Sequence, residues 1–394
     1  MDRRTVLLGL MGIAASQVAC QRTADQTLRI VTLKRALPPR LVATFKETQK
    51  VAQSASLNLK IDTETSVANL FHQLQQWRIG EEAPRNWWPL NFFSRSQSPA
   101  IANWVSLSDY WLTAAIQQDL ILPLVATAIP SWSDLPEIWQ SHLQRDRQGL
   151  PSEQGPPWAT PYRWGSLMIV YSRQHLNRIS WQPTQWRDLW NPKLEKRVAL
   201  PNHPRLVLGL VLKSLGNSIN VADPDAQTEF TEALAALRPQ VKVYDSDNYL
   251  QPLIQGDTWV AVGWSTDIRP ALSQYRQLAA FVPDPGTILS ADVWVKPRTK
   301  ASSSGVANLT AMDKAWLSYW WQSETATPFS LFSDGLSPLL ITPPVSTETD
   351  TDLSSEKVLL PTAGQLEQSE FIKPLSPAGV ESYTKLWRNL RGGE

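Results

Sequence analysis

Apolar and polar positions follow regular periods along the first eighty residues of the chain. Residues 57–63 alternate apolar and polar side chains as a half-buried strand does, and the apolar segment 27–33 is predicted as an earlier strand. Residues 38–49 and 66–80 place apolar side chains at helical spacing, which predicts one helix after each strand. The order strand, helix, strand, helix is typical of an α/β sheet wound from the N-terminus.

The same alternation returns in the central part of the chain. The predicted elements there are, in order, strand 166–172, strand 197–201, helix 205–216, helix 225–239 and strand 258–264, and a terminal helix covers 378–394. Two polar stretches, 144–158 and 354–370, are predicted as exposed connections. Two α/β lobes joined by short crossings follow from this pattern.

Composition limits the classes of function. A chain of 394 residues with 42% hydrophobic side chains can bury a large core and divide into two lobes. The formal net charge is +1 with 19% charged residues, so no broad electrostatic field favours nucleic acid or an acidic membrane. Recognition must therefore be local, and 19 Trp beside 9 Phe and 8 Tyr give ample flat rings to line a cleft.

The N-terminus predicts export. Residues 1–20 combine a charged start at Arg3-Arg4 with a short apolar run and small residues before Cys20. The arginine pair resembles the twin-arginine export motif, and Cys20 stands where a bacterial lipoprotein is cleaved and acylated, although Gln17 replaces the usual Leu. We expect a lipidated Cys20 followed by a linker at 21–26; the alternative is that Cys20 only ends the signal.

Catalytic and metal-binding motifs are missing from the sequence. Four scattered histidines and a single cysteine offer no ligand pair at zinc spacing, so we expect no metal site. No glycine-rich phosphate loop and no nucleophile elbow occurs, so we expect no cofactor and no enzyme. An exported α/β protein of this kind is most economically interpreted as a binding protein.

Four segments in collinear order resemble one known family. They are 106–124 (SLSDYWLTAAIQQDLILPL), 160–174 (TPYRWGSLMIVYSRQ), 186–225 and 237–267. Successive blocks of the bacterial periplasmic spermidine/putrescine-binding proteins are similar; these are type 2 (cluster D) solute receptors of ABC importers. The resemblance implies a two-lobed α/β fold of the type 2 periplasmic-binding-protein class, with the ligand cleft between the lobes.

That resemblance also implies an organisation and partners. We expect residues 27–161 and 287–310 in lobe 1, and residues 162–286 and 311–394 in lobe 2. The protein is expected to be a periplasmic monomer that delivers a polyamine-like solute to ABC permease subunits, without binding nucleic acid. If Cys20 is acylated, a lipid anchor holds it at the membrane.

Four positions match the family's pocket. Trp264 ends a predicted strand where the family stacks an indole on the ligand, and Asp292 matches a carboxylate that pairs with an amino group. Ser108 and Tyr110 match a loop whose hydroxyls bond the ligand. The alternatives are purely structural roles: Trp264 only fills the interface between the lobes, Asp292 bonds the backbone at the hinge, and Ser108 is the N-cap of a helix.

Other positions depart from the family. Lys34 and Arg35 follow the first strand where an acid is expected, and Asn202 and His203 stand where acids are common. These four residues join the candidate binding site. Lys34 and Arg35 either face solvent or indicate a ligand with a carboxylate or phosphate, its amine held by Asp292.

Two further interpretations stay open. The protein could be a degenerate receptor that acts as a membrane-anchored interaction protein, or a receptor for an anionic or zwitterionic solute. Ferric-ion receptors share the expected fold, but their paired tyrosines have no counterpart in this sequence.

Overall fold

The computed structural model describes the parts of the chain that form the two lobes. They are residues 26–53, 57–79, 100–300, 302, 304–341 and 360–392. The predicted export signal and Cys20 lie outside the described residues. Within the described ranges, every helix is too short or too polar to cross a lipid bilayer.

Strands and helices alternate along the chain. The strands are β1 (Gln26–Leu33), β2 (Leu57–Glu64), β3 (Trp104–Ser108), β4 (Ile121–Leu122), β5 (Thr160–Ser172), β6 (Val198–Leu200), β7 (Val241–Tyr244), β8 (Val260–Trp264), β9 (Leu278–Phe281), β10 (Ile288–Pro297) and β11 (Glu370–Phe371). The helices are α1 (Pro39–Gln53), α2 (Val67–Ile79), α3 (Leu112–Gln117), α4 (Glu137–Leu143), α5 (Arg173–Arg178), α6 (Pro204–Ser214), α7 (Thr228–Leu237), α8 (Leu250–Gln255), α9 (Ser265–Gln274), α10 (Ala311–Tyr319), α11 (Ser323–Phe332), α13 (Ala363–Glu367) and α14 (Pro377–Arg391).

These elements agree with the periodicity of the sequence. In α2 the apolar side chains Leu70, Phe71, Leu74 and Trp77 lie on one helix face and are buried, as their spacing predicts. The predicted strand 166–172 is the second half of β5, which begins at Thr160. The terminal helix is confirmed as α14, which starts at an N-cap where Ser376 accepts a bond from the Gly379 amide.

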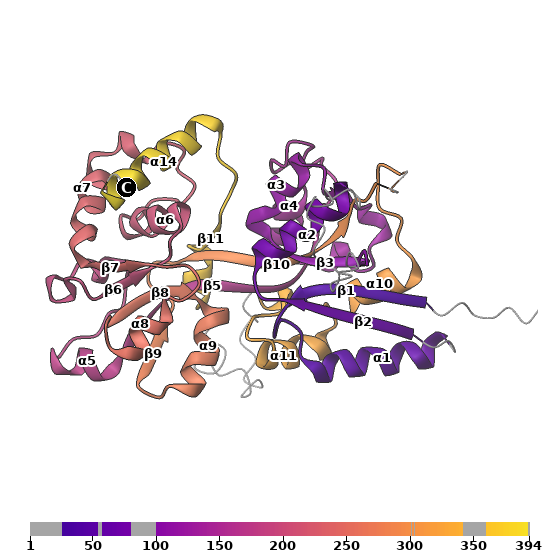
Figure 1. Ribbon diagram of the computed structural model, residues 1–394, viewed down its shortest axis with the longest axis horizontal. Coiled ribbons are helices and arrows are strands. Elements are labelled where there is room, and N and C mark those ends of the chain that lie inside the picture. Colours follow the sequence, from indigo (N-terminus) through magenta and orange to yellow (C-terminus); the bar gives the residue numbers. More distant parts are fainter. Residues whose placement is uncertain are drawn as a thin grey trace, which may run out of the picture.

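Two long strands join the lobes. The sheet order is β2-β1-β3-β10-β5-β8-β6-β7, so β10 and β5 lie at its centre. Figure 1 shows these two strands running from one lobe into the other, with helices on both faces of the sheet in each lobe. The first half of β5 pairs with β10, and its second half pairs with β8 and β9. The hinge region is therefore built from strands rather than from loops alone.

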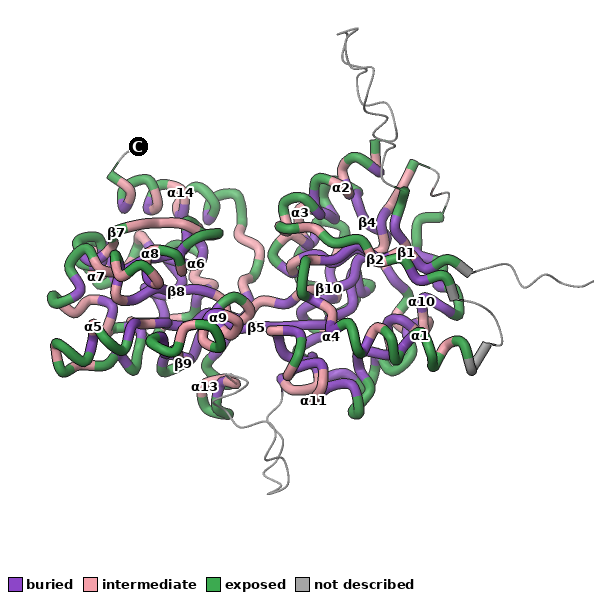
Figure 2. The backbone as a smooth tube through the Cα atoms, turned by 60° about the horizontal axis from the view of Figure 1, so that its bottom comes forward, coloured by how far each residue is buried: buried purple, intermediate pink, exposed green. Residues whose placement is uncertain are grey.

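Each lobe has its own hydrophobic core. One cluster contains side chains from β1, β3 and the first half of β5, up to Trp164. A second cluster begins at Leu167 and contains β6, β8, α6 and the face of α14, and a smaller third cluster lies beside it. Figure 2 shows the strands buried in both lobes, while the outer faces of the helices are exposed. The chain thus changes lobe between Trp164 and Leu167, and again between Ile288 and Leu289.

The expected lobe boundaries differ from the structure by a few residues at 161/162 and 286/287, and by a larger part of the last segment. Residues 311–394 were expected in lobe 2, but Trp316, Phe329 and their neighbours on α10 and α11 belong to the core of lobe 1. The Tyr319 hydroxyl also donates to the Leu41 carbonyl oxygen on α1, at 2.9 Å. Apolar burial against β1 and α1 decides this placement, and residue order along the chain does not reveal it. Residues of α14 do pack in lobe 2, as expected.

Candidate functional site

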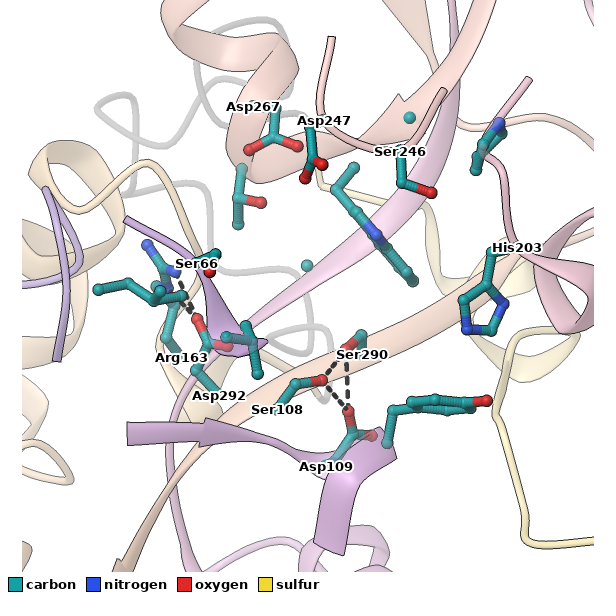
Figure 3. A pocket seen from close by; sticks show the side chains of 18 of the residues that line it. Ser66, Ser108, Asp109, Arg163, His203, Ser246, Asp247, Asp267, Ser290 and Asp292 are labelled. Carbon is teal, nitrogen blue, oxygen red and sulfur yellow. Dashed lines mark hydrogen bonds and ion pairs between the residues drawn. The ribbon is translucent and has the colours of Figure 1, made fainter. Parts of the chain in front are cut away.

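A cavity of about 700 Å³ lies between the two lobes. Its walls come from the segments that follow β1, β3 and β8, and from the hinge strands β5 and β10. Figure 3 shows serine, aspartate and histidine side chains pointing into this space from several sides. The volume falls in the range of small-molecule sites, about 300–1,000 Å³.

Trp264 is held at the edge of the cavity by its neighbours in sequence and space. It is the last residue of β8 and pairs with Leu167 on β5. Beneath the strand lies the ring of Tyr249; a Cβ on Gly263 would be only 1.9 Å from that ring, so the position excludes any side chain. The Trp264 amide donates to the Tyr249 hydroxyl at 3.2 Å. The indole is half-buried and lines the cavity.

Asp267 is a cleft residue that the sequence analysis did not select. It lies in the first turn of α9, three residues after Trp264, and its Oδ2 accepts a hydrogen bond from the Tyr249 hydroxyl at 3.0 Å. Its side chain is exposed to the open cavity, and desolvation by the protein around the carboxylate raises its pKa. An acid three residues after the strand-ending indole was the available signal, because the first turn of a helix that follows a strand lies at the same edge of the sheet.

Asp292 lines the cavity but already has a cation beside it. It lies directly opposite Arg163 in the antiparallel pairing of β10 with β5. The Arg163 Nε donates to Asp292 Oδ2 at 2.7 Å, Nη2 forms a second, short contact with the same oxygen, and Nη1 donates to the Ser333 carbonyl oxygen. Burial works against the guanidinium charge, but Asp292, together with Tyr162 and Asp267, outweighs this effect and raises the pKa of Arg163. The expected ammonium partner is therefore engaged by the protein's own arginine.

The loop after β3 contributes a second polar cluster. Ser108 makes no N-cap bond; its hydroxyl lies 3.3 Å from Asp109 Oδ1 and 3.4 Å from the Ser290 hydroxyl. Asp109 also accepts from Ser290 at 2.8 Å and from His142 Nε2 at 2.8 Å. Burial would raise the pKa of Asp109, but the bonds from His142, Ser290 and the Ala291 amide lower it, so the carboxylate stays ionised. Ser108 reaches the cavity and Asp109 anchors the loop.

Tyr110 and His203 meet edge to face across the cleft. Their ring centroids are 4.8 Å apart, and one residue belongs to each lobe. Burial, helped by nearby Arg205, lowers the pKa of His203 to about 4, so its imidazole is neutral at pH 7. Asn202, in contrast, was wrongly expected in the site: it is exposed, and its Oδ1 accepts from Arg391 on α14 at 2.8 Å. Its backbone follows β6 toward the cleft edge, but the side chain turns outward.

Lys34 and Arg35 both line the cavity, as the sequence analysis allowed. Arg35 forms an ion pair with Asp334 at 3.2 Å and remains largely exposed. Its backbone φ is 65°, a left-handed conformation that a long side chain seldom adopts. Lys34 is exposed, and within the described part of the chain it has no ion-pair partner.

The chemistry of the cavity is that of a binding site. Among the described residues no group of three or more His, Cys, Asp or Glu side chains could hold a metal ion. The walls offer an indole face, hydroxyls, carboxylates and basic side chains, which are the groups that orient a small polar guest. A cation at this site would find the ring of Trp264 and the carboxylate of Asp267 near each other on lobe 2.

Comparison with known proteins gives this geometry a family context. The family described as "Bacterial extracellular solute-binding protein" matches residues 104–356. The spermidine/putrescine-binding periplasmic protein 1 of Haemophilus influenzae is 25% identical over 205 residues, covering 52% of this chain and 54% of that protein. The putrescine/cadaverine-binding protein of Pseudomonas aeruginosa is 28% identical over 123 residues, covering 30% and 35% respectively. These curated relatives are matched over about half of their length or less.

The fold is shared along nearly the whole chain. The spermidine/putrescine ABC transporter substrate-binding protein of Streptococcus pneumoniae has a solved structure with a TM-score of 0.70 and 21% identity. The match covers 93% of this chain and 99% of that chain. The two-lobed type 2 fold expected from the sequence is thereby confirmed.

Proposed function

The chain belongs to the bacterial extracellular solute-binding protein family, and from this membership we propose that it is the receptor of an ABC importer for ammonium-bearing small molecules. The named relatives bind spermidine, putrescine or cadaverine, all of which are polyamines. We extend to this chain the feature these ligands share, a protonated amine on an aliphatic carbon chain. The receptor has no catalytic role in this proposal.

One observation supports the proposal above the others. Trp264 and Asp267 lie one helical turn apart on lobe 2, and both border the cavity of about 700 Å³. Tyr249 is bonded to both, through the Trp264 amide and the Asp267 carboxylate. A cation over an indole gains about 0.5–2 kcal/mol, depending on its desolvation, and a carboxylate adds a charge-assisted hydrogen bond. The pair is thus suited to an alkylammonium group.

Closure of the two lobes would complete the site. Tyr110 of lobe 1 and His203 of lobe 2 are in contact in the cavity lining, so a small rotation about β5 and β10 would open or close this contact. In the proposed function, the closed form presents its surface to the permease subunits of the importer as a monomer. The alternative of a degenerate interaction protein has less support, because Lys34 and Arg35 line the cavity and leave its volume open.

The test is a ligand panel on the purified chain. Isothermal titration calorimetry with putrescine, cadaverine, spermidine, n-butylamine, amino acids and sugar phosphates should give heat only with ammonium-bearing compounds. D267N should weaken this binding strongly, while D225N, at an exposed ion pair with Lys385 on the second lobe, should leave it unchanged. If the wild-type chain gives no heat of binding with any ammonium compound, the proposed function is refuted.

Attachment to the membrane is a separate part of the proposal. We propose export by the N-terminal signal and acylation at Cys20, because Arg3-Arg4, the apolar run and Val18-Ala19-Cys20 occur in the order that a lipoprotein signal requires. Expression of wild type and C20A in a bacterial host, followed by membrane fractionation, is the test. Wild type should be in the membrane fraction and C20A in the soluble fraction; equal partition would contradict acylation.

A further inference from the structure

The carboxylates of the cavity are unequally available to a guest. Five aspartates line it: Asp109, Asp247, Asp267, Asp292 and Asp334. Three of the five are held by other side chains of the protein: Asp109 by His142, Asp292 by Arg163 and Asp334 by Arg35. Asp247 and Asp267 have no cationic side chain within ion-pair distance among the described residues. The negative charge open to a guest therefore comes from these two positions.

Both available carboxylates belong to lobe 2. Asp267 lies in the first turn of α9, and Asp247 lies in the exposed connection between β7 and α8. In the view of Figure 3 they lie on one side of the pocket, and Ser108 and Ser290 lie on the other. An ammonium group bound at this side would sit beside the indole of Trp264, which also comes from lobe 2.

The wall contributed by lobe 1 adds Lys34, which has no ion-pair partner among the described residues, and Arg35, which is largely exposed beside its partner Asp334. Lys34 and Arg35 follow β1 and reach the same cavity, and Arg35 keeps its long side chain in spite of a backbone conformation that favours glycine. The Arg163 side chain packs directly against Gly335. A Cβ at position 335 would lie 2.3 Å from the Arg163 Cγ, so only glycine leaves room for this arginine. Lys34 and Arg35 line the same cavity as Asp247 and Asp267, so a guest bound there meets side chains of both lobes.

We propose that the preferred guest is a zwitterion with its charges at opposite ends, a straight-chain amino carboxylate, rather than a dication. This inference rests on the proposed function and narrows its substrate class. The ammonium group binds Asp267 and Asp247 against the indole, and the carboxylate faces Lys34 and Arg35. A diamine would direct its second ammonium toward these two cations, while the hinge carboxylate that could neutralise it is occupied by Arg163.

Calorimetry with four-carbon compounds of matched length tests the proposal. The wild-type chain should bind 4-aminobutanoate at least tenfold more tightly than n-butylamine and putrescine, and should not bind butanedioate. If putrescine binds as tightly as 4-aminobutanoate, the zwitterion inference falls and the proposed function stands. If none of the three ammonium compounds binds, and none of their two- to six-carbon homologues binds, the zwitterion inference and the proposed function are both refuted.

Variants of Lys34 and Arg35 separate recognition from folding. The double variant K34Q/R35Q should weaken 4-aminobutanoate about tenfold without weakening n-butylamine, because only the amino carboxylate has a group for these cations and the loss of Arg35 frees the Asp334 carboxylate. The matched control K385Q removes a positive charge from exposed α14 and should change neither affinity. Equal weakening of both compounds in K34Q/R35Q would overturn the assignment of the carboxylate end.

Discussion

Arg163 and Asp292 lie directly opposite each other on the two strands that join the lobes, with the Arg163 Nε 2.7 Å from Asp292 Oδ2. The two residues are 129 positions apart in the sequence, and both side chains are largely buried. The pair therefore links β5 to β10 at the hinge. It also occupies the Asp292 carboxylate, which the sequence most strongly suggested as a ligand-binding group, with the protein's own arginine.

Loss of one partner of this pair should be costly. R163M leaves the Asp292 carboxylate buried without its cation, so we expect unfolding to become easier by about 3–5 kcal/mol. The double variant R163M/D292N should recover part of that loss, because no uncompensated charge remains. Urea denaturation followed by circular dichroism measures both. The control K385Q, at an exposed pair, should leave the free energy of unfolding nearly unchanged. An equally small effect of R163M would show that the Arg163–Asp292 pair is not held as described.

Removal of the cleft indole should weaken binding without unfolding the protein. W264L loses the cation–π contact, worth about 0.5–2 kcal/mol, so the dissociation constant of an ammonium guest should rise about 2- to 30-fold. Trp387, which packs with Tyr244 and Arg391 away from the cavity, provides the matched control W387L. Calorimetry with the tightest ammonium ligand is the measurement, and an unchanged affinity in W264L would place the ring outside the binding surface.

The pH dependence of binding should follow Asp267. Burial raises its pKa above the ordinary aspartate value, and only the ionised carboxylate attracts an ammonium group. Affinity should therefore be fully developed above this raised pKa and fall as the pH drops through it, by about tenfold per pH unit below it.

Two variants isolate this titration. D267N should show weak binding with a flat profile over the same range. Y249F removes the phenolic bond that lowers the Asp267 pKa, so the fall should begin at a higher pH than in wild type. A wild-type profile that matches D267N in shape would exclude Asp267 as the titrating group.

The glycine that precedes the cleft indole should not tolerate a side chain. In G263A the new Cβ would lie 1.9 Å from the Tyr249 ring, so the ring must move and release the Trp264 amide and Asp267. We expect a loss of about 1–3 kcal/mol in the free energy of unfolding, as for other overpacked cores, together with weaker ligand binding. In the control G364A, which lies in α13, the new Cβ has no neighbouring atom within 4 Å. Its free energy of unfolding should therefore stay unchanged or rise slightly. Equal stability of the two variants would contradict the packing described here.

The sequence by itself determined the order and type of the main elements. Periods of two and of about 3.6 residues arise from local side-chain burial, so the strands around 27–33 and 57–63, the helix with Leu70, Phe71, Leu74 and Trp77, and the terminal helix are confirmed. Collinear blocks gave the resemblance to spermidine/putrescine-binding proteins, which the family match and the named relatives confirm. The end of an apolar strand also placed Trp264 correctly at the cavity.

Only the tertiary structure decided which residues share the cavity and in what state. The register of β5 against β10 places Arg163 beside Asp292, and no local pattern encodes a pairing across 129 residues. The outward turn of Asn202 depends on Arg391 of α14, and the packing of α10 and α11 in lobe 1 depends on burial against β1 and α1. Local periodicity is a property of neighbouring residues, whereas charge pairing and lobe membership are set by contacts between distant segments that form only when the chain folds.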